Sequence, residues 1–206
     1  MEKIERVAIC TAGEPRSLNY THESIKKFFD TYFGEYDIFA YIPKCPTDFY
    51  MEKYFPNAHI EVKEDTYIDD TKIPSNNMFK TGSNRMRKEY EKSKGFEYDW
   101  VIRSRIDVEY VPSLPPGDYT QDFLYLPNFH HFGGVNDRFA MGSSKLMDKY
   151  LNIIDIYNEN PKKCLHAECF LKYCLDYQKV PFKLIDIRFM RVRDDGQKMK
   201  HDLVDR

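Results

Sequence analysis

Short apolar segments alternate with helical segments along the first half of the chain, and this alternation constrains the fold more than any other feature. The pattern predicts strands at residues 6–11, 36–42, 59–63 and 100–108, and helices at residues 21–33, 49–55 and 77–94. The last of these helices carries many charges and is expected to lie exposed over a sheet. Strands that alternate with helices are typical of an α/β fold with a mostly parallel sheet.

The second half continues with further strands and helices. We expect strands at residues 123–126, 138–142 and 182–192, helices at residues 144–157 and 165–177, and polar segments at residues 64–76, 128–138 and after 192. Neither an internal repeat nor a linker interrupts the pattern, so a single domain over residues 1–206 is predicted. In such sheets ligands bind at the carboxyl ends of the strands, which is where site residues are sought.

Composition excludes several classes of protein. Lys and Arg number 31 against 33 Asp and Glu, so a net charge of −2 gives nucleic-acid binding no general electrostatic support. Apolar runs stay well short of the ~18 residues of a membrane span. The charged residues 1–6 lack the apolar core of a signal peptide. Five cysteines, an odd number, predict a reducing compartment, and Cys164, Cys169 and Cys174 are too evenly spaced to share a metal on a helix. We therefore predict a cytosolic protein.

The first candidate site is the loop that follows the first strand. Gly13 allows a ligand to approach the backbone, and the planar guanidinium of Arg16 can pair with a phosphate. The loop is neither a Walker A loop nor a dinucleotide fingerprint, because it has one Gly and no following Lys-Ser/Thr. A tight turn with a solvated Arg16 is the structural alternative.

The second candidate is the charged end of the strand at residues 100–108. Strand alternation places Arg103, Arg105, Asp107 and Glu109 on one face. Two acids at a strand end can hold a divalent cation that bridges a diphosphate, and the arginines can meet a phosphate directly. A cross-strand ladder of salt bridges is the alternative.

Two further segments carry chemistry-bearing side chains. The loop at residues 130–138 supplies His, Asn and Asp groups and ends at Asp137-Arg138, although a polar surface loop is an equal reading. Glu168 stands in the first turn of a helix, a position that the helix dipole alone would explain. The basic residues Arg188, Arg191 and Arg193 are predicted to be solvated.

These segments together resemble GT-A glycosyltransferases, in particular the small domains encoded by large DNA viruses of the chlorovirus kind. The resemblance rests on residues 6–17, 36–39, 99–108, 137–142 and 166–168, which occur in this order over nearly the whole chain. It implies a Rossmann-like, GT-A-like mixed sheet flanked by helices. It also implies a nucleotide-sugar donor, a UDP-sugar such as UDP-glucose, and a glycan or glycoprotein acceptor, in the host cytoplasm if the protein is viral.

By this resemblance, specific residues receive roles. An Asp-x-Asp motif in the family binds Mn²⁺ or Mg²⁺ and the donor diphosphate; here Asp107 and Glu109 occupy it, or residues 105–107, with His201 as a further ligand. The donor would be held by Thr11, Ala12, Gly13, Arg16, Lys80, Asn84, Arg85, Arg105 and Asp107. Either Asp137 or Glu168 would be the acid nearest the chemistry.

The implied reaction is consistent with the residues present. Glycosyl transfer needs a cation or Arg to meet the charge of the leaving diphosphate, and a carboxylate to take the proton of the acceptor hydroxyl. An inverting enzyme would use Asp137 or Glu168 as that base, whereas a retaining one needs none. The alternative is a non-catalytic nucleotide-sugar-binding module of a larger enzyme. A nucleotidyltransferase is disfavoured, because residues 11–17 contain one Gly and no Lys.

Overall fold

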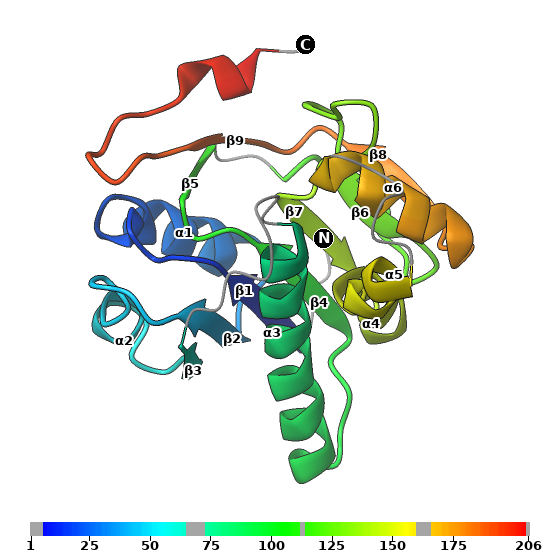
Figure 1. The fold of residues 1–206 in the computed structure, drawn as a ribbon, viewed down its shortest axis with the longest axis horizontal. Coiled ribbons are helices and arrows are strands. Elements are labelled where there is room, and N and C mark those ends of the chain that lie inside the picture. Colours follow the sequence, from blue (N-terminus) through cyan, green and yellow to red (C-terminus); the bar gives the residue numbers. More distant parts are fainter. Residues whose placement is uncertain (1–5, 65–72, 112–113, 160–165, 205–206) are drawn as a thin grey trace.

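The computed structural model describes residues 6–64, 73–111, 114–159 and 166–204 (Figure 1). The charged N-terminal residues 1–5, Cys164 and most of the polar segment predicted at residues 64–76 lie outside the described residues. Within them the chain forms a central sheet flanked by helices. No described helix is both long enough and apolar enough to span a membrane.

The central sheet has seven strands in the order β3-β2-β1-β4-β7-β6-β8. In chain order these are β1 (Val7–Ala12), β2 (Tyr36–Pro43), β3 (His59–Lys63), β4 (Trp100–Ser104), β6 (Leu124–Pro127), β7 (Phe139–Gly142) and β8 (Phe182–Ile185). Neighbours are parallel except around β7, which is antiparallel to both β4 and β6. This confirms the predicted mostly parallel α/β sheet. Two more strands, β5 (Val108–Val111) and β9 (Arg188–Arg191), form a separate antiparallel pair.

Helices cover both faces of the sheet. They are α1 (Leu18–Tyr32), α2 (Tyr50–Tyr54), α3 (Ile73–Lys94), α4 (Ser144–Leu151), α5 (Ile154–Glu159), α6 (Ala167–Tyr177) and the short 3₁₀ helix η1 (Lys200–Leu203). In Figure 1, α1 and α2 lie to the left, α4 to α6 to the right, and α3 crosses between them. Strand β1 is buried along its whole length, because Val7 and Ile9 join the core under α1 while Ala8 and Cys10 join the core under α4 and α6.

The strand order reverses direction at β1. The connection from β1 to β2 runs through α1, whereas that from β3 to β4 runs through α3 on the opposite face. Parallel register pairs Thr11 with Ser104, so the carboxyl ends of β1 and β4 lie side by side. A reversal of this kind opens a crevice between the two loops that leave these strands, and ligands bind there in open α/β sheets.

Several predicted elements end earlier than expected. The strand predicted at residues 100–108 stops at Ser104, where the Ile106 carbonyl accepts a hydrogen bond from Thr21 Oγ1 (2.6 Å) instead of a ladder bond. The strand predicted at residues 182–192 is divided between two sheets as β8 and β9, and the helix predicted at residues 144–157 breaks into α4 and α5.

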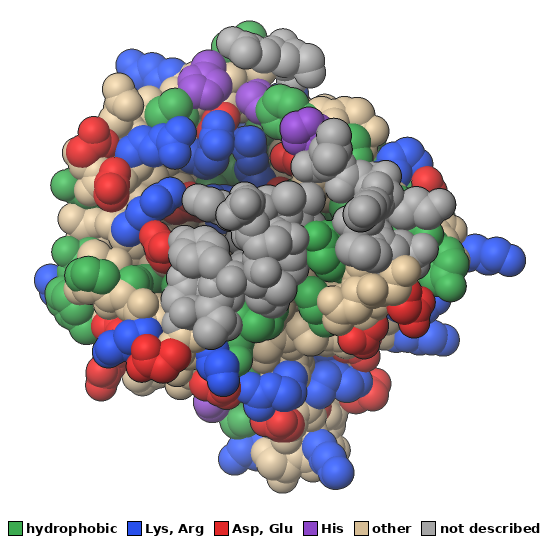
Figure 2. Space-filling model, in the orientation of Figure 1, with side chains coloured by type: hydrophobic (Ala, Val, Ile, Leu, Met, Phe, Trp, Pro, Cys, Tyr) green, Lys and Arg blue, Asp and Glu red, His purple; other side chains and the backbone are tan. Residues whose placement is uncertain are grey.

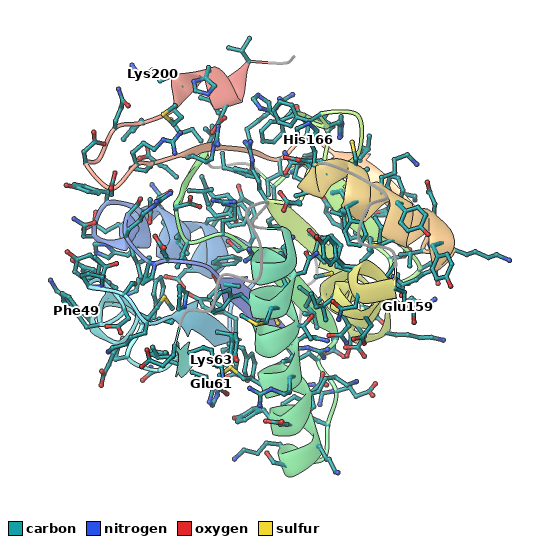
Figure 3. The ribbon with its side chains drawn as sticks, viewed as in Figure 1. Phe49, Glu61, Lys63, Glu159, His166 and Lys200 are labelled. Carbon is teal, nitrogen blue, oxygen red and sulfur yellow. The ribbon has the colours of Figure 1, made fainter. Side chains whose placement is uncertain are left out.

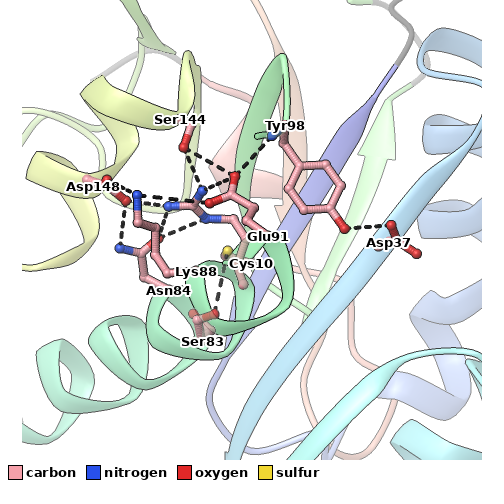
Figure 4. Close-up of polar contacts among 10 residues, drawn as sticks. Cys10, Asp37, Ser83, Asn84, Lys88, Glu91, Tyr98, Ser144 and Asp148 are labelled. Atoms are coloured by element: carbon pink, nitrogen blue, oxygen red, sulfur yellow. Dashed lines mark hydrogen bonds and ion pairs between the residues drawn. The ribbon is translucent and has the colours of Figure 1, made fainter. Parts of the chain in front are cut away.

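Helix α3 is not the exposed helix that its charges suggested. Arg87 is fully buried and donates hydrogen bonds to Glu91 (2.7 Å), to Ser144 Oγ at the start of α4 (2.7 Å), and to Asn84 and Asp148 (Figure 4). Glu91 also accepts the Tyr98 backbone N–H at 3.0 Å. The charges on this face of α3 therefore form a buried polar network that joins α3 to α4.

Candidate functional site

Five cationic side chains and three carboxylates meet at the carboxyl ends of β1 and β4. We call this group the basic cluster; its members are Lys80, Arg103, Arg105, Arg138, Arg191, Asp107, Asp137 and Asp202. Figure 2 shows Lys and Arg side chains gathered around a hollow in the upper part of the face in view. Cations outnumber carboxylates in the cluster, so it favours an anionic ligand.

Lys80 and Asp137 form a buried ion pair within the cluster. Lys80 reaches from α3 to Asp137, which lies just before β7, and Nζ is 3.0 Å from Oδ2. Because β7 runs antiparallel to β4, its first residues lie beside the end of β4. Burial opposes ionisation of Asp137, but the charges of Lys80 and Arg105 outweigh it and hold the Asp137 pKa far below its usual value. Asp137 is therefore a poor proton acceptor.

Arg105 and Asp107 form a second pair in the loop after β4. Arg105 Nε and Nη2 donate to the two Asp107 carboxylate oxygens at 2.7 and 2.6 Å, a bidentate arrangement. Burial works against the charged carboxylate, but Arg105 more than compensates and lowers the Asp107 pKa. This pairing means that Asp107 presents its oxygens to a guanidinium.

Arg103 differs from its neighbours because the structure gives it no carboxylate partner among the described residues. Its side chain lies beside Cys10 on the α3 face of the sheet and is 4% exposed. The guanidinium donates to the backbone carbonyls of Ser104 and Ala12, the latter at 3.5 Å, and Nε has no hydrogen-bond partner. Burial lowers the Arg103 pKa. A buried charge with an unused donor is costly unless a ligand anion meets it.

Asp202 joins the C-terminal segment to the cluster. It is fully buried and accepts bonds from Arg191 Nε (2.8 Å) and Nη2 (2.9 Å), and Arg138 Nη1 lies 3.4 Å from Oδ1. Burial is again outweighed, here by the hydrogen bonds from Arg191, so the Asp202 pKa lies far below its usual value. The prediction that Arg191 is solvated is therefore wrong, and the C-terminal segment is not a free polar tail.

The loop after β1 borders the cluster. Ala12 contributes its carbonyl to Arg103, and Gly13 adopts φ of 111°, a conformation that glycine favours. Arg16 lies 3.7 Å from Glu14 and close enough to Asp107 to help lower its pKa. Thr11 Oγ1 is buried without a partner.

Glu168 lies at the edge of the cluster, in the first turn of α6. Figure 3 labels His166, the N-cap of α6 two residues before Glu168, near the same end of the molecule as Lys200 of η1. Burial, and then the negative charge of Asp137, raise the Glu168 pKa above its usual 4.5. Glu168 therefore holds a proton more readily than Asp137 does, as a general base requires.

Two residues predicted to face the donor from α3 have other partners. Asn84 is buried between Arg87 and Asp148, to which its Nδ2 donates at 3.1 Å. Arg85 is partly exposed and pairs with Glu61 (2.6 Å) and Glu89 (3.1 Å). Among the three predicted donor residues of this helix, the described contacts bring only Lys80 into the cluster.

The residues predicted to bind Mn²⁺ or Mg²⁺ do not fit a divalent cation. Asp107 is paired with Arg105, and Glu109 lies on β5 in the second sheet, where it pairs with Lys198 at 2.7 Å. His201 is 44% exposed and 3.7 Å from Asp202. The described residues contain no group of three or more His, Cys, Asp or Glu able to hold a metal ion. The prediction placed Asp107 and Glu109 on one face of a single continuous strand. That strand ends at Ser104, and Glu109 belongs to β5 instead.

A cavity of about 580 Å³ lies at the opposite edge of the sheet, away from the cluster. Its lining includes Tyr36, Asp37 and Tyr98 near the amino ends of the strands, and Tyr98 Oη donates to Asp37 at 2.6 Å. Among its charged groups, Arg6 pairs with Asp99 and Asp37 accepts the Tyr98 hydrogen bond. Ligands of open α/β sheets bind at the other edge, beyond the carboxyl ends of the strands. We therefore place the candidate site at the basic cluster.

A family model described as a domain of unknown function (DUF7796) matches residues 76–200, which is more than half of the chain. The chain belongs to the DUF7796 family. The DUF7796 match contains every cation of the basic cluster, together with Asp107, Asp137 and Glu168. The β1 loop and Asp202 lie outside it.

This DUF7796 protein was also compared with curated proteins and with solved structures. No curated protein matches it. Among solved structures, it is similar to the "crystal structure of a glycosyltransferase involved in the glycosylation of the major capsid of PBCV-1". The TM-score is 0.48 and the identity 11%, over 87% of this chain and 81% of the other. A TM-score at this level does not by itself establish a common fold.

Proposed function

We propose that the protein is a glycosyltransferase that transfers a sugar from a nucleoside-diphosphate sugar to a hydroxyl of a glycan or glycoprotein acceptor. The observation that carries the proposal is the excess of cationic side chains, three of them buried, at the carboxyl ends of β1 and β4, with Glu168 beside them. The motif resemblance of residues 6–17, 99–108 and 137–142 supports a UDP-sugar such as UDP-glucose as the donor.

The donor would lie across the reversal point of the sheet. Its diphosphate is the part with the highest charge density, and Arg103, Arg105 and Lys80 surround the place where it would sit. The unused Nε of Arg103 is a donor available to a phosphate oxygen. Gly13 leaves open space beside the β1 loop, because a Cβ at this position would contact nothing within 4 Å.

The chemical step needs a base for the acceptor hydroxyl. In an inverting transfer the acceptor oxygen forms a bond to the anomeric carbon as the bond from that carbon to the diphosphate oxygen breaks. The proton goes to the Glu168 carboxylate, and the electron pair leaves with the nucleoside diphosphate. Glu168 suits this role because its pKa is raised, whereas Asp137 is held ionised by Lys80 and serves to position that lysine.

The test is a transfer assay with UDP-glucose and other nucleotide sugars against a panel of glycan acceptors. We expect release of the nucleoside diphosphate that depends on the acceptor, together with a glycosylated product seen by mass spectrometry. Absence of both binding and release for every nucleotide sugar would overturn the proposal.

A non-catalytic nucleotide-sugar-binding module is the second candidate. It is favoured by the ion pairs that engage Asp107 and Asp137, which leave Glu168 as the single proton acceptor proposed for the site. Donor binding without release or transfer, for all acceptors tried, would distinguish this function from the first.

A further inference from the structure

Arg103 and Arg87 are both buried, but their hydrogen-bond partners differ. The fully buried Arg87 is surrounded by Glu91, Asp148, Asn84 and Ser144, and no polar atom of its side chain lacks a partner. Arg103 is almost as buried but bonds only to backbone carbonyls, with Nε unused. The same fold thus contains one buried arginine that is neutralised and one that is not.

Each carboxylate of the basic cluster is paired with a cation other than Arg103. Asp107 is held by Arg105, Asp137 by Lys80, and Asp202 by Arg191. A divalent cation at this place would have to displace Arg105 from Asp107, and would add positive charge to a region where cations already outnumber carboxylates. An anion, by contrast, would neutralise Arg103 and use its free N–H.

We infer that Arg103, supported by Lys80 and Arg105, takes the part of a divalent cation and binds the donor diphosphate directly. This inference rests on the proposed function and concerns the same site. Guanidinium and ammonium groups fixed in a buried site can stabilise the charge that develops on a leaving diphosphate, as a metal ion does elsewhere. Arg103 would then be a catalytic residue, since it touches the group that leaves.

The experiment is a calorimetric titration of the full chain with UDP-glucose, in EDTA and again in Mn²⁺. We expect the dissociation constants in the two solutions to agree within about twofold. Binding that is lost in EDTA and restored by Mn²⁺ would overturn the inference and leave the glycosyltransferase proposal standing. Absence of binding under both conditions, for UDP-glucose and for other nucleotide sugars, would overturn the proposed function itself.

Arg103→Gln separates a ligand-binding role from a structural one. Loss of a charge-assisted contact with a phosphate is expected to weaken UDP-glucose binding by about 10- to 100-fold. The melting temperature without ligand should not fall, because the substitution removes a buried charge that has no carboxylate partner. The control is Arg6→Gln. Arg6 directly precedes β1, is exposed and pairs with Asp99 outside the basic cluster, so this variant should bind UDP-glucose as the wild type does. Unchanged binding by Arg103→Gln would contradict the inference.

Discussion

At the scale of single residues, two carboxylates of the candidate site have pKa values that are shifted in opposite directions. Asp137 is next to Lys80 and stays ionised, whereas Glu168 lies in a partly buried position where Asp137 repels a second negative charge. Arg138 and Lys80 act in the other direction on Glu168 but do not outweigh burial and Asp137. The two acids can therefore divide the work of positioning a cation and accepting a proton.

Glu168→Gln tests that division. Loss of the general base should lower the transfer rate by about 10²- to 10⁴-fold while UDP-glucose binding stays the same. In the wild type, the rate should fall as pH is lowered through the raised Glu168 pKa, and this acidic limb should be missing from the residual activity of the variant. Glu159→Gln, an exposed glutamate at the end of α5 that is not part of the basic cluster, is the control (Figure 3). A normal transfer rate in Glu168→Gln would exclude the residue as base.

The sequence predicts some of these residues and not others, for physical reasons. Arg103 lies near the end of an apolar strand and Arg105 and Asp107 follow it, so their position at a strand end could be predicted. Arg191 lies in a segment predicted as a strand, Asp202 lies in the predicted polar tail, and the ion pair between them forms only in the folded chain. Their role could not be predicted, because an ion pair between two separate segments leaves no local pattern in the sequence.

At the scale of elements, α3 is the part whose charges were most misleading. Residues spaced as in a solvated helix form two kinds of pair: Arg85–Glu89 on the exposed side and Arg87–Glu91 on the buried side. Both are i, i+4 pairs of the same residue types two positions apart. Which one is buried depends on α4, because Ser144 and Asp148 complete the partners of Arg87. Charge spacing alone cannot separate the two.

These two pairs allow a matched test of burial. Arg87→Met leaves Glu91 buried without its main cation and should lower the free energy of unfolding by about 3–5 kcal/mol. Arg85→Gln removes two exposed pairs, with Glu61 and Glu89, and should still cost less than about 1 kcal/mol. Urea unfolding monitored by circular dichroism would measure both. Equal losses would show that the α3–α4 network does not contribute as a buried ion pair.

A glycine fixes the loop before β7 against α6. A Cβ at Gly134 would collide with the Glu168 carbonyl carbon and oxygen, which are backbone atoms that cannot move aside cheaply. Gly134→Ala should therefore lower the melting temperature and, by displacing Glu168, the transfer rate. Gly117→Ala, where the nearest atom would be 3.9 Å away, should change neither. A stable and fully active Gly134→Ala protein would contradict this account of the loop.

At the scale of the whole molecule, Asp202 links distant parts of the chain. It bonds to β9 through Arg191 and lies close to Arg138 at the start of β7, while β9 itself pairs with β5. The α/β layers could be predicted from alternating strands and helices. The second sheet could not, because β5 and β9 are short, lie far apart in the chain and have no hairpin turn between them.

The ion pairs of Asp202 with Arg191 and Arg138 should make the stability of the protein depend on pH in the acidic range. The pKa of Asp202 is lowered in the folded state, so its contribution to stability is complete above its ordinary value of 3.8 and is lost as pH falls below that value. Asp202→Asn should be less stable than the wild type near neutral pH, and the difference should shrink in acid. Thermal unfolding at several pH values would measure this. A difference that stays constant down to low pH would argue against the ion pairs.

The hydrogen bond from Ser17 Oγ to the Val192 carbonyl, 2.7 Å long, joins residues 175 positions apart. Contacts of such separation form slowly, because a long loop must close before they contribute. Strands β1, β2, β3 and β4 of the central sheet can pair with one another before residues 188–204 pack against them, so their pairing does not require this long loop to close. During refolding, the far-ultraviolet signal of the sheet should therefore recover before the ability to bind nucleotide. The order in which the chain folds would make ligand binding its final event.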